Sequence, residues 1–423
     1  MSPESASSKK HTRQKDFLPE LPASLQVDES VLALKRLQMD AILVAMARSH
    51  ANVSDLFFVV GHPPHVELDG FIHALETDPP HTALSAEQIE EMFFLMTGGE
   101  DRLAWDYHSL GSCDFSYSVS MARFRVNYFR RNNQPAMVLR KLPATVPSIS
   151  ELNLPPVFSQ IIREKNGLIL VTGRTGHGKT TTLAALIDEL NSNSAIHVVT
   201  LEDPIEFVHP IKRSIISQRE LGRDFHDFST GLRASLRQSP KVILIGEIRD
   251  RDTIEIALTA AETGHLVLGT LHTIDAGQSI GRILGMFDKD EEVLVRQRLT
   301  DTLRWVVSQR LVTKIGGGRH LLTEVMGHNL STREAILTGE KEGRSFGEII
   351  ASCHTQGWHT FDQQILEAFR EGWITEDTAL LYSNQKTRLS KEFDSLRKER
   401  EFAESKPGDS GLRLDGPVLR ARV

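Results

Sequence analysis

The segment GLILVTGRTGHGKTTTLAALIDEL (167–190) decides the fold, because an apolar run, a glycine-rich loop and an amphipathic pattern follow one another in it. Its centre, GRTGHGKT (173–180), matches the P-loop pattern G-x-x-x-x-G-K-[ST], in which backbone N–H groups surround phosphates. The apolar residues after the loop recur at helical spacing, at Leu183, Leu186, Ile187 and Leu190. This order predicts a phosphate site at the start of a helix.

Each part of the loop has an expected task. Lys179 is expected to reach the β- and γ-phosphates, Thr180 to bind Mg²⁺, and Thr181 to contact the α-phosphate. The glycines let the backbone turn toward the phosphates. We therefore predict that ATP and Mg²⁺ bind here. The predicted nucleotide-binding residues are Gly173, Arg174, Thr175, Gly176, His177, Gly178, Lys179, Thr180 and Thr181.

Hydrolysis requires carboxylates beside the phosphates, and two segments supply them. The apolar run KVILIG (241–246) leads to Glu247, which is expected to hold the hydration shell of Mg²⁺, with Thr180, or to orient water. The usual aspartate position before it is Gly246, so this Walker B sequence is atypical. The second segment is LEDPIE (201–206), and one of its carboxylates is expected to be the general base. These candidates are Glu202, Asp203 and Glu206.

Short apolar runs alternate with helix-compatible sequence through the middle of the chain, in GLILVTG, HVVTLED, KVILIGE and HLVLGTLHT. This alternation predicts an α/β fold with a doubly wound, mostly parallel sheet. His265 and His272 bracket the last run, at a spacing that is poor for a metal site. Two roles stay open for them: structural hydrogen bonding, or sensing the γ-phosphate or bridging to a neighbouring subunit.

The residues before the core are expected to form a smaller N-terminal α+β domain. Helical spacing over 31–49 and near 85–97, short strands at 55–60 and 65–70, and alternation over 113–128 indicate an antiparallel sheet with helices. After it, the proline-spaced KLPATVPSISELNLPP favours neither helix nor sheet. VSQRLVTK and HLLTEVM are possible edge strands in the C-terminal part. The predicted divisions are a disordered arm (1–28), the N-terminal domain (29–140), a linker (141–156), the ATPase core (157–290), a mainly helical C-terminal part (291–388) and a charged or disordered tail (389–423).

Composition excludes several classes of protein. The 423 residues carry a formal net charge of −7, whereas nucleic-acid binders carry a basic surplus. Two cysteines, Cys113 and Cys353, are too few for a disulfide framework or a four-cysteine zinc site. No apolar run approaches the roughly 18 residues of a membrane-spanning helix. We expect a cytoplasmic protein that binds no nucleic acid and does not insert into a membrane.

Four ordered motifs, GRTGHGKTT, TLEDPIEF, ILIGEIRD and AETGHLVLGTLHT, resemble the Walker A, Asp box, Walker B and His box of the secretion-superfamily ATPases. These proteins drive type IV pili and type II and type IV secretion. VSDLFFVVGHPPHVELDG, MARFRVNYFRRN, MVLRKLP and WHTFDQQI are similar to segments of the PilT/PilU-type twitching-motility branch. The resemblance covers residues 30–385.

The resemblance implies a RecA-like core with a PAS-like N-terminal domain and C-terminal helices. It also implies a homohexameric ring, peripheral at the inner face of the membrane and docked on an inner-membrane platform protein, with ATP between the N-terminal domain and the core. Glu206 is the preferred base by the family pattern, Glu202 the alternative, and Glu247 the Mg²⁺-side carboxylate. Arginines at matching positions can neutralise γ-phosphate charge. They are Arg123, Arg125, Arg140, Arg233 and Arg237.

The function implied by the resemblance is ATP hydrolysis that turns N-terminal domains against cores and powers pilus retraction. Retraction members carry an AIRNLIRE-like helix where this chain has STREAILTGE (331–340), so a related secretion or accessory ATPase remains the alternative. A nucleic-acid translocase needs basic channel loops with aromatic residues, and this chain has only 4 Tyr and 4 Trp. The acidic cluster argues against a scaffold with vestigial hydrolysis.

Overall fold

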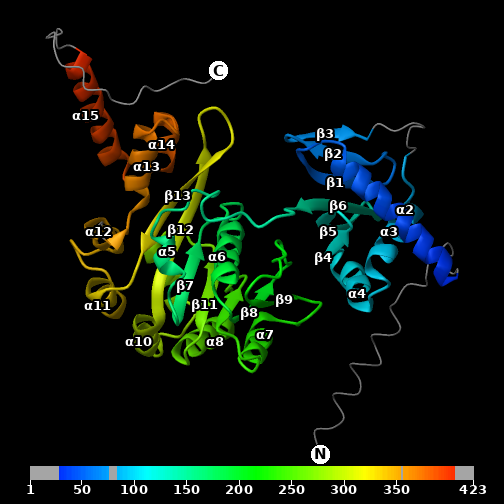
Figure 1. Ribbon diagram of the computed structural model, residues 1–423, viewed down its shortest axis with the longest axis horizontal. Coiled ribbons are helices and arrows are strands. Elements are labelled where there is room, and N and C mark those ends of the chain that lie inside the picture. Colours follow the sequence, from blue (N-terminus) through cyan, green and yellow to red (C-terminus); the bar gives the residue numbers. More distant parts are fainter. Residues whose placement is uncertain (1–27, 76–82, 354–355, 405–423) are drawn as a thin grey trace, which may run out of the picture. The chain divides into compact units, whose positions relative to one another are not determined.

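The computed structural model describes residues 28–75, 83–353 and 356–404 (Figure 1). The chain forms two compact units, and each is described by itself. The first takes in the chain up to Leu170, Lys179–Leu271 and Asp301–Arg304. The second takes in Val171–Gly178, His272–Thr300 and the chain from Trp305. The predicted arm lies almost wholly outside the described residues.

An antiparallel sheet of six strands, in the order β3-β2-β1-β6-β5-β4, forms the N-terminal part of the first unit. Its strands are β1 (Val53–Val59), β2 (His65–Leu68), β3 (Phe71–Ala74), β4 (Ser112–Val119), β5 (Ala122–Arg131) and β6 (Gln134–Leu142). The register places Arg140 opposite Asp55 on one side and opposite Arg125 on the other. Arg125 in turn lies opposite Ser116. The antiparallel sheet predicted from the alternation is confirmed.

Three helices accompany this sheet: α2 (Glu29–Arg48), α3 (Ala86–Thr97) and α4 (Asp101–Leu110). The Asp28 carboxylate caps α2 by accepting a hydrogen bond from the Ser30 N–H at 3.0 Å. Met39, Leu43 and Met46 recur every three to four residues, and this stripe of α2 is buried with residues of β1 and β5 in one core. Phe124, Val126 and Tyr128 alternate into the same core, as the sequence predicts.

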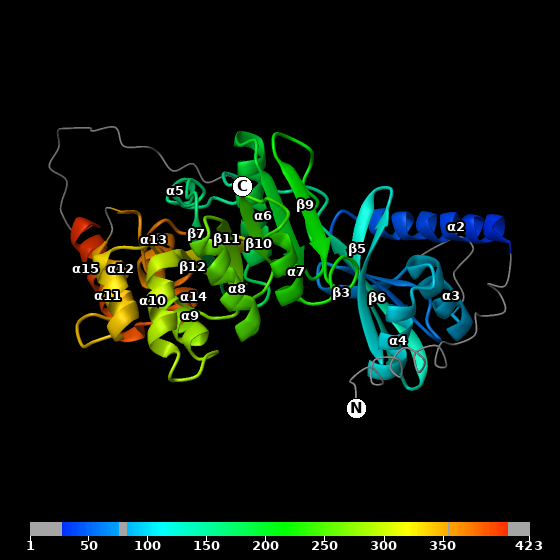
Figure 2. The same ribbon diagram turned by 90° about the horizontal axis from the view of Figure 1, so that it is seen from below.

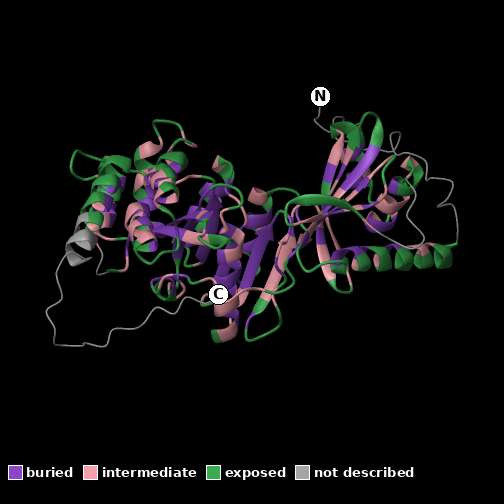
Figure 3. Ribbon diagram, turned by 90° about the horizontal axis from the view of Figure 1, so that it is seen from above, coloured by how far each residue is buried: buried purple, intermediate pink, exposed green. Residues whose placement is uncertain are grey.

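The second sheet has seven strands, in the order β13-β12-β7-β11-β10-β8-β9. They are β7 (Gly167–Thr172), β8 (His197–Glu202), β9 (Ile215–Glu220), β10 (Val242–Ile245), β11 (Leu266–Leu271), β12 (Leu303–Thr313) and β13 (Arg319–Met326). β8, β9, β10 and β11 pair in parallel, and β12 pairs with β13 antiparallel. Every residue of β7, β10 and β11 is buried (purple in Figure 3), because parallel strands are covered on both faces. The mostly parallel sheet is confirmed, and both predicted segments are strands, but only β13 is an edge strand, because β12 lies between β13 and β7.

The chain from residue 157 contains further helices, and those of the core alternate with strands as expected. Those of the core are α6 (Lys179–Asn193), α7 (Phe228–Ser235), α8 (Arg251–Glu262) and α9 (Ala276–Leu284) (Figure 2). Of these, α7 contacts β8 and α8 contacts β11. The others are α5 (Phe158–Ile161), α10 (Glu292–Thr302), α11 (Leu330–Thr338), α12 (Phe346–Ser352), α13 (Phe361–Arg370), α14 (Glu376–Tyr382) and α15 (Lys386–Glu404). None of the helices within the described ranges is long and apolar enough to cross a membrane.

Two predicted boundaries differ from the structure. The linker was expected from residue 141, but β6 continues to Leu142 because its last residues pair with β5. The segment from residue 389, predicted to be a charged or disordered tail that contains a plausible charged helix, is helical to Glu404 in α15. Leu389 and Phe393, four residues apart, form a buried pair on this otherwise charged helix, in a core that includes Phe361 of α13. Residues 405–423 lie outside the described residues.

Removing the Phe393 ring tests the packing of α15. The ring is 1% exposed, and its centroid lies 4.4 Å from that of Phe369. Phe393→Ala is expected to lower the free energy of unfolding by about 3 kcal/mol, because it leaves a cavity in this core. Urea unfolding followed by circular dichroism measures the change. Leu381→Ala, at a side chain that is 68% exposed, should change it by less than about 0.5 kcal/mol. Equal midpoints for Phe393→Ala and wild type would contradict the packing.

Candidate active site

The phosphate loop has the backbone that its glycines predict. Gly173 has φ 144°, and a Cβ there would lie 2.6 Å from the Gln309 carbonyl oxygen, so only glycine fits. Gly176 and Gly178 have φ of 80° and 82°, in the left-handed region. The His177 Nδ1 lies 3.1 Å from the same Gln309 carbonyl oxygen, so this side chain is directed to β12. Arg174 and Thr175 are exposed at the tip of the loop.

The first turn of α6 brings the predicted lysine and threonine beside two carboxylates. Lys179 is the first residue of α6 and is 8% exposed. Burial lowers the pKa of Lys179, and the negative charges of Glu247 and Glu206 oppose that shift. The Thr180 hydroxyl hydrogen-bonds to Glu206. Thr181 is half-buried in the same turn. Lysine, hydroxyl and carboxylates therefore meet at the helix start.

Glu247 lies two residues beyond the end of β10, and the structure explains its glycine neighbour. A Cβ at Gly246 would lie 2.9 Å from the Leu201 carbonyl oxygen of β8, so an aspartate cannot be placed there without moving the strand. The Glu247 carboxylate accepts an ion-paired hydrogen bond from Arg249 Nη2 at 2.7 Å. Arg249 is not among the predicted site residues, although a cation two residues after the Walker B glutamate in GEIRD is a visible signal.

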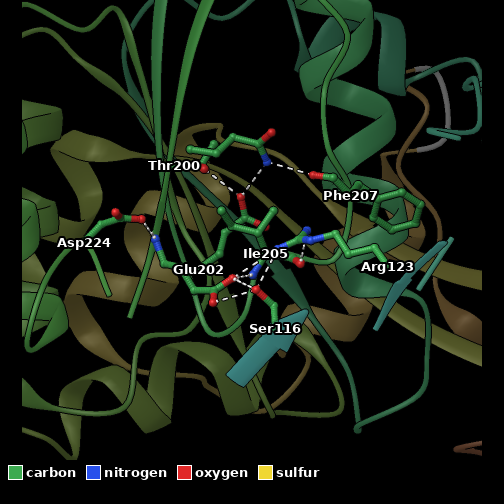
Figure 4. Close-up of polar contacts among 9 residues, drawn as sticks. Ser116, Arg123, Thr200, Glu202, Ile205, Phe207 and Asp224 are labelled. Carbon is green, nitrogen blue, oxygen red and sulfur yellow. Dashed lines mark hydrogen bonds and ion pairs between the residues drawn. The ribbon is translucent and has the colours of Figure 1, made fainter. Parts of the chain in front are cut away.

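The three carboxylates of the acidic segment have different surroundings. Glu202 is 7% exposed, and one of its oxygens accepts hydrogen bonds from Thr200 Oγ1 at 2.6 Å and Gln218 Nε2 at 3.1 Å (Figure 4). Burial raises the pKa of Glu202. Asp203 is exposed. Glu206 is half-buried, and of the three it is the one that meets the first turn of α6. This placement favours Glu206 over Glu202 as the base.

Two of the predicted arginines influence the pKa of Glu206. Burial raises the pKa of Glu206, while the charges of Arg125 and Arg140 and of Lys179 lower it. Arg140 Nε also donates to Asp55 Oδ1 at 2.9 Å, although its side chain is 71% exposed. The register of β5 and β6 places these two arginines opposite one another. The pair therefore gives the site positive charge from the N-terminal sheet.

The other predicted basic residues are placed differently. Arg123 forms an ion pair with Glu220 at 3.1 Å and donates to the Ile205 carbonyl oxygen at 2.6 Å, so it is bound by protein groups. Arg233 and Arg237 are exposed on and just after α7, and in the described chain Arg237 Nη1 donates to the Arg233 carbonyl oxygen at 3.4 Å. A role for these three at the γ-phosphate stays a prediction.

The two histidines also differ in their surroundings. His265 is half-buried, and its Nδ1 lies 3.0 Å from the Ala260 carbonyl oxygen of α8. This hydrogen bond holds the turn between α8 and β11, which favours the structural role. His272 is exposed directly after β11. Its roles at the γ-phosphate or at a neighbouring subunit stay predictions.

The oxygen groups at the helix start suit Mg²⁺, which prefers hard oxygen ligands. Thr180 offers a hydroxyl, and Glu247 and Glu206 offer carboxylates. Among the described residues, no group of three or more histidines, cysteines or carboxylates is arranged to hold a metal by itself. At nucleotide sites, magnesium is usually bound by one or two carboxylates together with phosphates and water.

The chain is similar to several known proteins. Residues 113–357 match the family model described as type II/IV secretion system protein. The chain is 38% identical to the type IV pilus retraction ATPase PilT of Pseudomonas aeruginosa, over 81% of this chain and 97% of that protein. It is 36% identical to the type IV pilus ATPase PilU of the same organism, over 78% and 85%. The crystal structure of the pilus retraction motor PilT with bound ADP aligns with a TM-score of 0.74 at 36% identity, over 84% of this chain and 98% of that one.

Proposed function

The chain belongs to the type II/IV secretion system protein family, and we propose from this membership that it is an ATP-hydrolysing motor that powers type IV pilus retraction and twitching motility. One observation carries the proposal: the similarity to a retraction ATPase extends over 97% of that protein. The carboxylates that meet the first turn of α6 supply the chemistry for hydrolysis.

Hydrolysis at this site needs a positioned water and a proton acceptor. The water oxygen attacks the γ-phosphorus, the bond from that phosphorus to the bridging oxygen of ADP breaks, and the Glu206 carboxylate takes the water proton. The Lys179 ammonium neutralises charge on the β- and γ-phosphates. Burial raises the pKa of Glu206, and Arg125 and Arg140 add positive charge that opposes this rise. ADP and inorganic phosphate then leave.

We propose Mg²⁺ as the cofactor, held by Thr180 and Glu247. When bound with ATP, the ion neutralises phosphate charge. Of these two residues, Glu247 is held by another protein group: its carboxylate forms an ion pair with Arg249 Nη2 at 2.7 Å. Arg249 is therefore expected to keep that carboxylate oriented.

The assembly proposed for the chain is a homohexamer. Its force output and membrane attachment would pass through protein partners, an inner-membrane platform protein first among them, because no described helix can cross a membrane. In the ring, Arg233 and Arg237, both exposed, are available to a neighbouring copy. The location proposed is cytoplasmic, at the inner face of the membrane.

A related secretion or accessory ATPase is the second candidate. The observation behind it is the segment STREAILTGE (331–340), most of which lies in α11, because it departs from the AIRNLIRE-like helix that the resemblance leads us to expect there. Similarity to PilU, a pilus ATPase of the same family, is almost as extensive as similarity to PilT.

Deleting the gene and counting surface pili separates the candidates. Retraction predicts an excess of pili that do not retract and a loss of twitching. Restoring the wild-type gene should reverse both effects, whereas a gene encoding Lys179→Ala should reverse neither, because hydrolysis is expected to be lost. Bald cells would indicate pilus assembly, and an unchanged number of pili would indicate secretion; either result would contradict retraction.

A further inference from the structure

Glu220, the last residue of β9, receives hydrogen bonds from three directions. Its carboxylate accepts from Ser116 Oγ at 2.8 Å and 2.9 Å, from Arg123 Nη2 at 3.1 Å, and from the Ile205 N–H at 3.2 Å (Figure 4). Ser116 belongs to β4 and Arg123 to β5 of the N-terminal sheet, while Ile205 belongs to the acidic segment after β8. One carboxylate therefore joins the N-terminal sheet to the segment that carries the proposed base.

The peptide groups of Ile205 are held on both sides. Glu220 accepts from its N–H, and Arg123 Nη1 donates to its carbonyl oxygen at 2.6 Å. Because the carbonyl of Ile205 forms the peptide bond with Glu206, these contacts fix the backbone that leads directly into the base. Arg123 and Glu220 are themselves ion-paired, so the two contacts support each other.

The chain after Glu206 is held from the same strand. Gln218 Nε2 donates to the Phe207 carbonyl oxygen at 2.8 Å, and Gln218 Oε1 accepts from the His209 N–H at 3.0 Å. Gln218 and Glu220 are two residues apart on β9, so their side chains lie on one face of the strand. Glu206 therefore lies between two anchored residues.

The contacts at Glu220 are shielded from water, which makes them costly to disturb. The side chains of Glu220 and Arg123 are 8% and 17% exposed. Hydrogen bonds to a buried carboxylate are stronger than neutral ones, and removal of one partner leaves the other charge buried and unpaired. The arrangement is therefore suited to holding one defined geometry of the acidic segment.

We propose that Glu220 is a positioning residue for hydrolysis, which fixes Glu206 through Ile205 and ties that position to the N-terminal sheet through Arg123 and Ser116. This inference rests on the proposed ATPase function. Because the Glu220 carboxylate acts through Ile205, Arg123 and Ser116, we expect it to affect the rate of the chemical step and not nucleotide affinity.

The kinetic test compares Glu220→Ala with wild type in the full chain. We expect kcat for ATP to fall about 30-fold, because a small misplacement of a reacting group can cost 10²-fold. The KM for ATP and the dissociation constant of a fluorescent ADP analogue should stay within about twofold. Glu220→Gln retains an acceptor for the Ile205 N–H and should recover part of the rate. Glu255→Gln, at an exposed residue of α8, is the matched control.

A second comparison separates positioning of Glu206 from a general structural role. If Glu220 acts through Glu206, then Glu220→Ala should add less than about a twofold loss in the Glu206→Gln background. A full additional loss in that background would overturn the proposal, as would a rise in KM that accounts for the whole effect. A wild-type chain without ATPase activity would instead remove the proposed function.

Hydrogen exchange tests the positioning without any reliance on hydrolysis. Glu220→Ala should speed exchange of amides in the segment 203–208, because the Ile205 N–H loses its acceptor. Amides of α8 should exchange as in wild type. Unchanged exchange over 203–208 would overturn the positioning role even if the chain hydrolyses ATP.

Discussion

Lys179→Ala is expected to lower kcat for ATP hydrolysis by about 10³-fold, since loss of one preorganised charge-stabilising group in an active site costs roughly 10² to 10³. Lys179 is 8% exposed at the start of α6, so water cannot easily replace its ammonium group. Without it, Glu206 and Glu247 would face the phosphates with no lysine to balance their charge. Nucleotide affinity should fall as well.

Phosphate release and binding of a fluorescent ATP analogue measure the two effects. Lys212→Ala is a suitable control, because it also removes a lysine that lies close to α6. Lys212 forms an ion pair at 2.7 Å with Asp188, which belongs to α6 as Lys179 does. Lys212→Ala is expected to change kcat by no more than about twofold. Near-normal turnover by Lys179→Ala would mean that the phosphate loop is not the site of hydrolysis.

The phosphate loop and the central strands were predictable because their signals are local. Four consecutive apolar residues (168–171), a glycine pattern and a helical stripe lie within 167–190, so no distant residue is needed to interpret them. The alternation of Phe124, Val126 and Tyr128 is equally local, and these residues are buried as predicted. The order of the four motifs along the chain indicated the protein family.

Contacts between distant residues were not predictable from pattern. Arg123 and Glu220 are 97 positions apart, and β9 carries the polar sequence IISQRE, which has no strong strand signal. The sequence shows only that Gly246 stands where an aspartate is usual. The structure shows that a side chain at position 246 would collide with the Leu201 carbonyl oxygen. In α15, Leu389 and Phe393 pack into a hydrophobic core, which the charged composition of this segment did not predict. Each case depends on a partner that sequence position alone does not identify.

Exchange of each glutamate of the acidic segment for glutamine separates the two candidate bases. Glu206→Gln is expected to lower kcat by about 10²- to 10⁴-fold with little change in the KM for ATP, because it removes the proton acceptor but keeps the shape. Glu202→Gln should cost less than about tenfold, since Glu202 is already occupied by Thr200 and Gln218. A larger loss from Glu202→Gln would reverse the assignment.

The pH profile of kcat tests independently whether Glu206 is the general base. A general base must be ionised, so the rate should fall on the acid side as Glu206 takes up a proton. Burial raises the pKa of Glu206, and Arg125 is the largest influence that lowers it. Arg125→Ala should therefore raise that pKa and move the acid limb to higher pH, whereas Glu206→Gln should abolish the limb. An acid limb that survives Glu206→Gln would assign the proton acceptor to another group, because glutamine at position 206 cannot titrate.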